Sequence, residues 1–65
     1  MDMQEEIAKC DEIAVELLSK YESADEVPAW VVKQAVMDKF GFVEGSHEML
    51  VMDLVDDVFT MMHEG

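Results

Sequence analysis

Apolar side chains recur every three to four residues along most of this chain, and this helical spacing is broken at two places. Side chains three or four positions apart lie on one face of an α-helix. The strict alternation of a half-buried strand, and hairpin turns such as Asn-Gly, do not accompany the β-branched residues. A short extended segment at Phe42-Val43-Glu44 would not change the class. The spacing therefore predicts an all-α fold.

The first predicted helix covers residues 3–21 and has an apolar side and a charged side. The charged side, which we expect to face solvent, contains two Glu residues that each precede a Lys by four positions, the favourable orientation for a helical ion pair. It comprises Glu5, Lys9, Glu12, Glu16 and Lys20. The apolar side, which we expect to face the core, comprises Met3, Ile7, Cys10, Ala14, Leu17, Leu18 and Tyr21.

The second predicted helix covers residues 26–40 and follows the break at residues 22–26. Pro28 is tolerated in a first helical turn, and Asp25 is a suitable N-cap. Gly41 is a suitable residue just beyond the C-terminus. Trp30 and Met37 lie on one flank of the core stripe, with Val31 and Ala35 on the other. The core stripe itself is Ala29, Val32, Val36 and Phe40.

The third predicted helix covers residues 47–63, begins after Ser46 as N-cap, and would be ~25 Å long. Its apolar side chains span roughly 200° of arc, whereas a surface helix needs about 100°. Two short neighbours cannot easily cover this arc, so we expect a three-helix bundle that forms a homodimer through the third helix. The arc contains Leu50, Val51, Met52, Leu54, Val55, Val58, Phe59, Met61 and Met62.

The charge of the chain restricts its partners. Sixteen acidic residues and four lysines give a formal net charge of −12, although 51% of the 65 residues are hydrophobic. Disordered acidic tails combine high charge with low hydrophobicity, so a single folded acidic domain over residues 1–65 is expected. A strongly negative surface attracts basic proteins and disfavours direct binding to nucleic acid or anionic membranes. The acidic N-terminus and the lack of a long apolar run favour the cytoplasm.

The sequence contains no glycine-rich phosphate loop, nucleophile elbow or zinc-ligand pair, and its acids are too numerous for any one pair to indicate catalysis. Cys10 is the only cysteine and lies among carboxylates, which raise a thiol pKa, so we interpret it as a small core residue. Glu44 and His47 have Glu-x-x-His spacing, but a di-iron bundle needs two such motifs and two further glutamates. His47 and His63 lie at opposite ends of the third helix. We therefore predict no catalytic residue, metal site or cofactor.

The acidic side of the third helix is the main candidate binding site. Asp53, Asp56 and Asp57 have i, i+3, i+4 spacing and no lysine beside them, so their repulsion would be relieved by a cationic partner. Rows of carboxylates on a compact body can imitate the phosphates that DNA-binding proteins expect. In size and charge the chain resembles small bacteriophage proteins that inhibit host DNA-binding or defence proteins, which implies a location in the host cytoplasm. Further acids predicted to contribute are Glu64, Glu12 and Glu16.

An apolar contact surface is the alternative candidate. Methionine provides adaptable contacts, and four of the seven methionines lie on the third helix. A small oligomeric adaptor would bind through this side, with its charge serving only solubility. Salt should weaken electrostatic mimicry but not apolar docking. The residues of this predicted apolar face are Met52, Val55, Phe59 and Met62.

One short segment has a resemblance of its own. Met37-Asp38-Lys39-Phe40-Gly41-Phe42, between two predicted helices, resembles the Met-Gly-Phe loop of ubiquitin-associated domains. Those domains are three-helix bundles, so the resemblance implies the same helix count. Phe40 replaces the usual methionine beside the glycine, and the long third helix also differs from that family.

Overall fold

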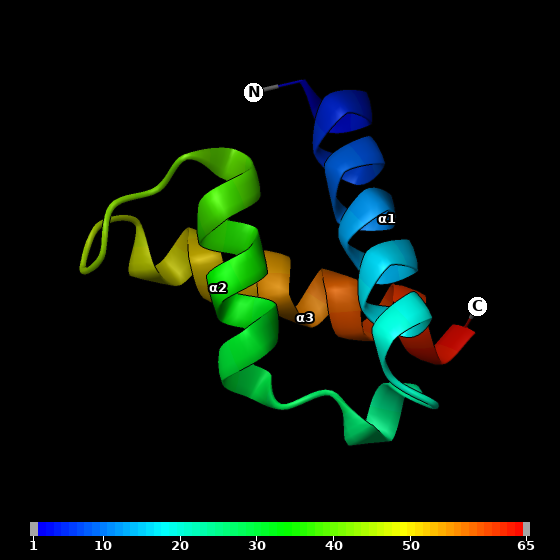
Figure 1. Cartoon of the computed structure of the whole chain (residues 1–65). Coiled ribbons are helices and arrows are strands. Elements are labelled where there is room, and N and C mark those ends of the chain that lie inside the picture. The colour runs from blue at the N-terminus through cyan, green and yellow to red at the C-terminus, as the bar shows by residue number, and fades with distance from the viewer. Residues whose placement is uncertain (1, 65) are drawn as a thin grey trace.

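The computed structural model describes residues 2–64, and all regular secondary structure in that range is helical (Figure 1). Helix α1 spans Met3–Lys20, α2 spans Ala29–Phe40 and α3 spans Glu48–Glu64, with a short 3₁₀ helix η1 at Ala24–Glu26. No strand occurs in the described range. The prediction of an all-α chain with three helices is confirmed. Within these residues, no helix combines the length and apolar character needed to cross a bilayer.

The three helices form one compact body. Figure 1 shows α1 and α2 side by side in opposite directions, with α3 running across both on one side of the pair. Each helix contacts the other two, and η1 contacts α3. The Cα radius of gyration is 11.0 Å, close to the value of about 11 Å expected for a globular chain of this length.

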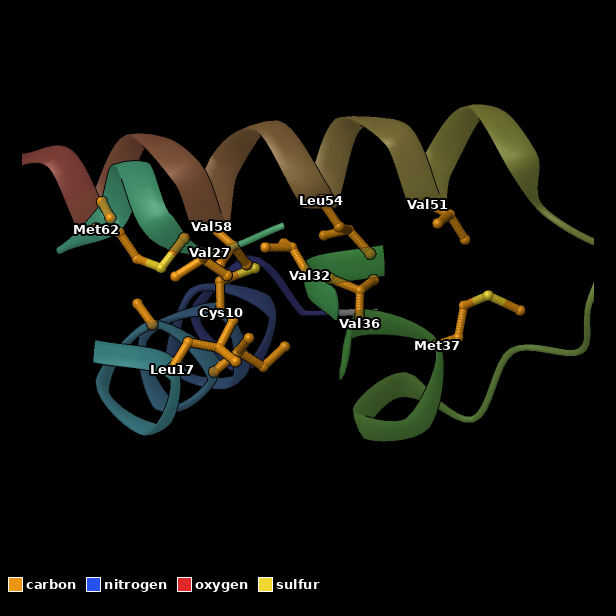
Figure 2. Packing of buried hydrophobic residues seen from close by; sticks show 13 residues of the cluster. Cys10, Leu17, Val27, Val32, Val36, Met37, Val51, Leu54, Val58 and Met62 are labelled. Carbon is orange, nitrogen blue, oxygen red and sulfur yellow. The ribbon is translucent and has the colours of Figure 1, made fainter. Parts of the chain in front are cut away.

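The core lies where α3 crosses the other two helices. Figure 2 shows Val58 and Met62 directed towards α1, whereas Val51 and Leu54 are directed towards α2. Leu54 is 0% exposed, as are Val32 and Val36 of α2. The complete buried set is Cys10, Ile13, Ala14, Leu17, Ala24, Val27, Val32, Val36, Met37, Val51, Leu54, Val58 and Met62.

The buried side of α1 is rotated relative to the prediction. Cys10, Ala14 and Leu17 are buried as expected, but Met3 is 73% and Ile7 51% exposed. Ile13, absent from the predicted side, is 1% exposed. The reason is that α1 packs against α2 as well as α3, so its second half buries an additional flank.

The charged side of α1 does not face solvent along its whole length, which corrects the prediction. The Lys9 Nζ lies 5.2 Å from the ring centroid of Phe40 on α2, a cation–π geometry. The Glu12 Oε2 lies 3.2 Å from the Lys39 Nζ, also on α2. Part of this side therefore forms the interface between α1 and α2.

The start of α2 also differs from the prediction, because residues 26–28 are not part of it. Pro28 has φ −65° and ψ 144° and precedes the first helical residue, Ala29. The residue before a proline is disfavoured in the helical conformation, and Val27 is extended with φ −78° and ψ 117°. Asp25 lies in η1 and does not cap α2. Val27 is instead buried in the core.

In the connection between α2 and α3, the predicted C-terminal residue of α2 is confirmed, whereas the predicted N-cap of α3 is wrong. Gly41 has φ 75°, and the N–H groups of Gly41 and Phe42 both donate to the carbonyl of Met37. The Gly41 bond is the 5→1 bond of an αL cap, and the Phe42 bond is the 6→1 bond of a Schellman motif. Ser46 is not the N-cap of α3. The carbonyl of His47 accepts the first helical bond, from the Val51 N–H at 2.8 Å, and His47 adopts φ 55°.

Candidate interaction surface

The outer face of α3 is a row of exposed carboxylates. Asp53, Asp56 and Asp57 are all exposed, since the helix buries Leu54 and Val58 on its other side. The acids of α3 are Glu48, Asp53, Asp56, Asp57 and Glu64, and the helix contains no lysine. Its formal charge is therefore −5, whereas two lysines and one aspartate give α2 a formal charge of +1. Net negative charge is therefore concentrated on α3, the helix that crosses the other two.

Three of the four lysines interact with groups outside α3. Lys39 pairs with Glu12 of α1 at 3.2 Å, and Lys33 pairs with Glu44 at 3.8 Å. Lys9 lies over an aromatic ring of α2. Within residues 2–64, no ion pair involves a carboxylate of α3. Within these residues, no direct ion pair therefore offsets the mutual repulsion along α3.

The six acids predicted as one binding set occupy two places. Asp53, Asp56, Asp57 and Glu64 are exposed on α3. Glu12 and Glu16 are on α1, and Glu16 lines a hollow of about 520 Å³ between α1 and α2 together with two lysines. The two groups belong to different surfaces of the molecule, and within residues 2–64 no carboxylate of the α3 group forms an ion pair with a lysine.

A second, mainly apolar feature lies between α2 and α3. This hollow of about 340 Å³, called here the Trp30–Met52 hollow, borders a smaller one of about 240 Å³ that shares Lys33, Val51 and Met52. Trp30 is 70% and Met52 71% exposed, so two large apolar side chains face solvent beside each other. The residues that line the larger hollow are Ala29, Trp30, Lys33, Val51, Met52, Val55 and Asp56.

The predicted apolar face is divided between surface and core. Met52 and Val55 line the Trp30–Met52 hollow. Phe59 is half-buried, with its ring 6.5 Å from that of His63, and Met62 is 3% exposed within the core. The prediction did not include Trp30, although its position off the core stripe of α2 and near a broad apolar helix was a signal available in the sequence.

Cys10 lines a fourth hollow, between α1 and α3, but its thiol is not activated. Burial raises the pKa of Cys10 to about 11, and the carboxylates of Asp57 and Glu6 act in the same direction. A thiolate is the nucleophilic form of cysteine. The thiol therefore stays protonated at neutral pH, in agreement with its interpretation as a core residue.

The two histidines lie in separate environments. Glu44 of the Glu-x-x-His segment pairs with Lys33, and the His47 ring lies 5.0 Å from that of Phe42. His63, at the other end of α3, has its Nε2 3.8 Å from the Asp25 Oδ1 of η1. Each ring thus has a local partner of its own.

Comparison with protein-family models, curated proteins and solved structures finds no match to this chain. The resemblance of residues 37–42 to ubiquitin-associated domains remains local. The left-handed Gly41 and the two N–H···O bonds to Met37 explain this segment as a helix terminus. The surfaces described above are therefore the basis for proposing a function of this chain.

Proposed function

We propose that this chain is a non-enzymatic interaction protein whose acidic α3 face binds a basic surface of a partner protein. The observation that carries this proposal is the exposed row of Asp53, Asp56 and Asp57, which has no cation paired with it within the described residues. Like charges at this spacing destabilise a helix by a few tenths of a kcal/mol per pair. A cationic partner would remove that cost and provide favourable charge interactions.

The proposed partner is a nucleic-acid-binding protein, for which the acidic face acts as a mimic of phosphate and hence as an inhibitor. Such proteins expose rows of Lys and Arg that contact phosphates. Neighbouring carboxylates on α3 are ~5–6 Å apart at their Cβ atoms, so several can meet one such row. A role in host takeover or anti-defence by a bacteriophage remains a prediction from size and charge.

The experiment starts with affinity capture from the cells that produce the chain, followed by titration of the purified partner. Replacing Asp53, Asp56 and Asp57 by Asn removes three charges at nearly constant size. Affinity at low salt should fall, and the slope of log affinity against log salt should shrink, because the substitutions remove ion pairs that salt screens. DNA or RNA should compete with the unmodified chain for the partner.

A matched control removes three charges outside α3. Glu5, Asp11 and Glu22 are exposed, and their replacement by Gln, Asn and Gln should leave most of the affinity intact. Circular dichroism would verify that both variants are folded. Full binding by a folded triple-Asn variant, or equal reductions in affinity for the two variants, would reject recognition by the α3 row.

An adaptor that binds through apolar side chains is the second candidate, and the exposed Trp30 and Met52 favour it. In that case Met52→Gln would abolish binding, while the triple-Asn variant would bind fully at all salt concentrations.

The homodimer through α3 stays a prediction. Two copies would carry a formal charge of 2 × (−12) = −24, which opposes their association. Sedimentation equilibrium at tens of micromolar tests it, and a 7.4 kDa monomer at that concentration would reject it.

A further inference from the structure

The Trp30–Met52 hollow combines an apolar lining with an acidic border. Trp30, Met52 and Val55 are among its apolar lining residues, and Asp56 lies in the lining itself. The adjoining smaller hollow has Glu48, one helical turn before Met52, in its lining. Lys33 is the basic residue shared by both hollows, and it is paired with Glu44. The local field over this surface is therefore dominated by the carboxylates of α3.

Helix pairs bind other helices by accepting apolar side chains into the groove between them, while charges at the border select the partner. The two hollows share Lys33, Val51 and Met52, so they form one elongated surface along the α2–α3 junction. An amphipathic helix presents apolar side chains one turn apart and can place one in each hollow. The charge of the border determines which kind of helix fits.

Resting on the function proposed above, we infer that the Trp30–Met52 hollow binds a basic amphipathic helix of the partner. Its apolar side chains fill the two hollows, and its Lys or Arg side chains lie against Asp53 and Asp56 of α3. The occupant follows from charge complementarity, because α3 has a formal charge of −5 and the whole chain −12.

A second copy of the chain is a poor occupant of the same hollow. A two-fold symmetric interface brings the same surface patch of both copies together. Asp56 and Glu48 would then face the equivalent carboxylates at close range, and like charges across an interface oppose association. An acidic or neutral helix would lack the attraction that a basic helix has at this border.

The test uses a synthetic peptide as the probe and Trp30, the single tryptophan, as the reporter. The peptide contains only Leu and Lys, has leucines at helical spacing, and is about 18 residues long, above the length at which helices are marginal. A scrambled peptide of the same composition has no apolar face. Only the amphipathic peptide should shift the Trp30 emission to shorter wavelength, because it alone buries an indole that is 70% exposed.

Two substitutions of the same type separate the hollow from general charge attraction. Met52→Gln changes the lining without changing charge, and should weaken binding of the amphipathic peptide at least tenfold. Met49→Gln is the matched control, because Met49 is 85% exposed on the same helix and lines neither hollow. It should change the affinity less than twofold. Mapping of ¹⁵N–¹H shifts on the unmodified chain should place the changes at Ala29, Lys33 and Val55.

The outcomes distinguish this inference from the function on which it rests. Equal, salt-sensitive binding of both peptides without a change in Trp30 emission would overturn the hollow as the binding site and leave charge recognition intact. Failure of both peptides to bind at low salt would overturn both proposals. A shift of Trp30 emission with protein concentration alone would show that a second copy fills the hollow, and would also overturn the inference.

Discussion

Replacing Leu54 by Ala should be among the most destabilising substitutions in this chain. Leu54 is 0% exposed at the point where α3 crosses α2 (Figure 2). The deleted side-chain groups alone correspond to about 2.5 kcal/mol at ~0.8 kcal/mol per CH₂. The cavity left behind raises the cost to about 3–5 kcal/mol. A domain of this size has a free energy of unfolding of roughly 3–10 kcal/mol, so the variant would lose a large fraction of its stability.

Leu50→Ala provides the matched comparison, one turn earlier on the same helix. Leu50 is 39% exposed, so the same chemical change should cost about 1–2 kcal/mol. Urea denaturation followed by circular dichroism measures both, and a decrease of about 3 kcal/mol corresponds to a fall in Tm of roughly 12–24 °C. Equal costs for the two variants would refute the packing of α3 described here, because they would place both leucines in equivalent environments.

Three further predictions concern the net charge and the buried thiol. Added salt should raise the Tm between low and moderate ionic strength, because it screens repulsion in a chain of formal charge −12; a flat Tm would show that the acids are already compensated. Cys10 should react with iodoacetamide at pH 8 far more slowly in the folded chain than in urea, and equal rates would contradict its burial. Folding raises the pKa of Cys10 from 9.0 to about 11. The stability that this thiol contributes should therefore be present below pH 9 and lost as the pH rises through 11. Urea denaturation across that pH range would measure the loss.

The three helices could be predicted from the helical spacing of their apolar side chains, and the C-terminus of α2 also had a local signal. Gly41 adopts the left-handed conformation that its position implied. The start of α2 could not be placed because Pro28 serves equally well inside a first turn or just before it, and only the extended Val27 decides between the two. The rotation of α1 was missed because the 3.6-residue period identifies an apolar side but not its neighbours. Ile13 is buried because α2 covers one flank of α1.

The acidic row could be predicted because solvent exposure of charged residues follows from the helical wheel of α3 alone. The Trp30–Met52 hollow could not, since it requires residues from two helices to meet. These residues come together because α3 crosses over α2, and no local sequence pattern determines how two helices cross. The crossing of α3 over α1 places Met62 in the core, although Met62 shares the apolar arc of α3 with Met52.

The uneven placement of lysines makes the electrostatic potential of the molecule asymmetric. All four lysines belong to α1 and α2, whereas α3 runs across one side of that pair with a formal charge of −5 (Figure 1). A basic partner of the kind proposed above would therefore be drawn towards α3 and oriented before contact. Such steering raises association rates by factors of about 10–10³, while the dissociation rate depends on the interactions finally made. Mutations on α3 outside the binding area would then slow the encounter and leave the lifetime of the complex unchanged.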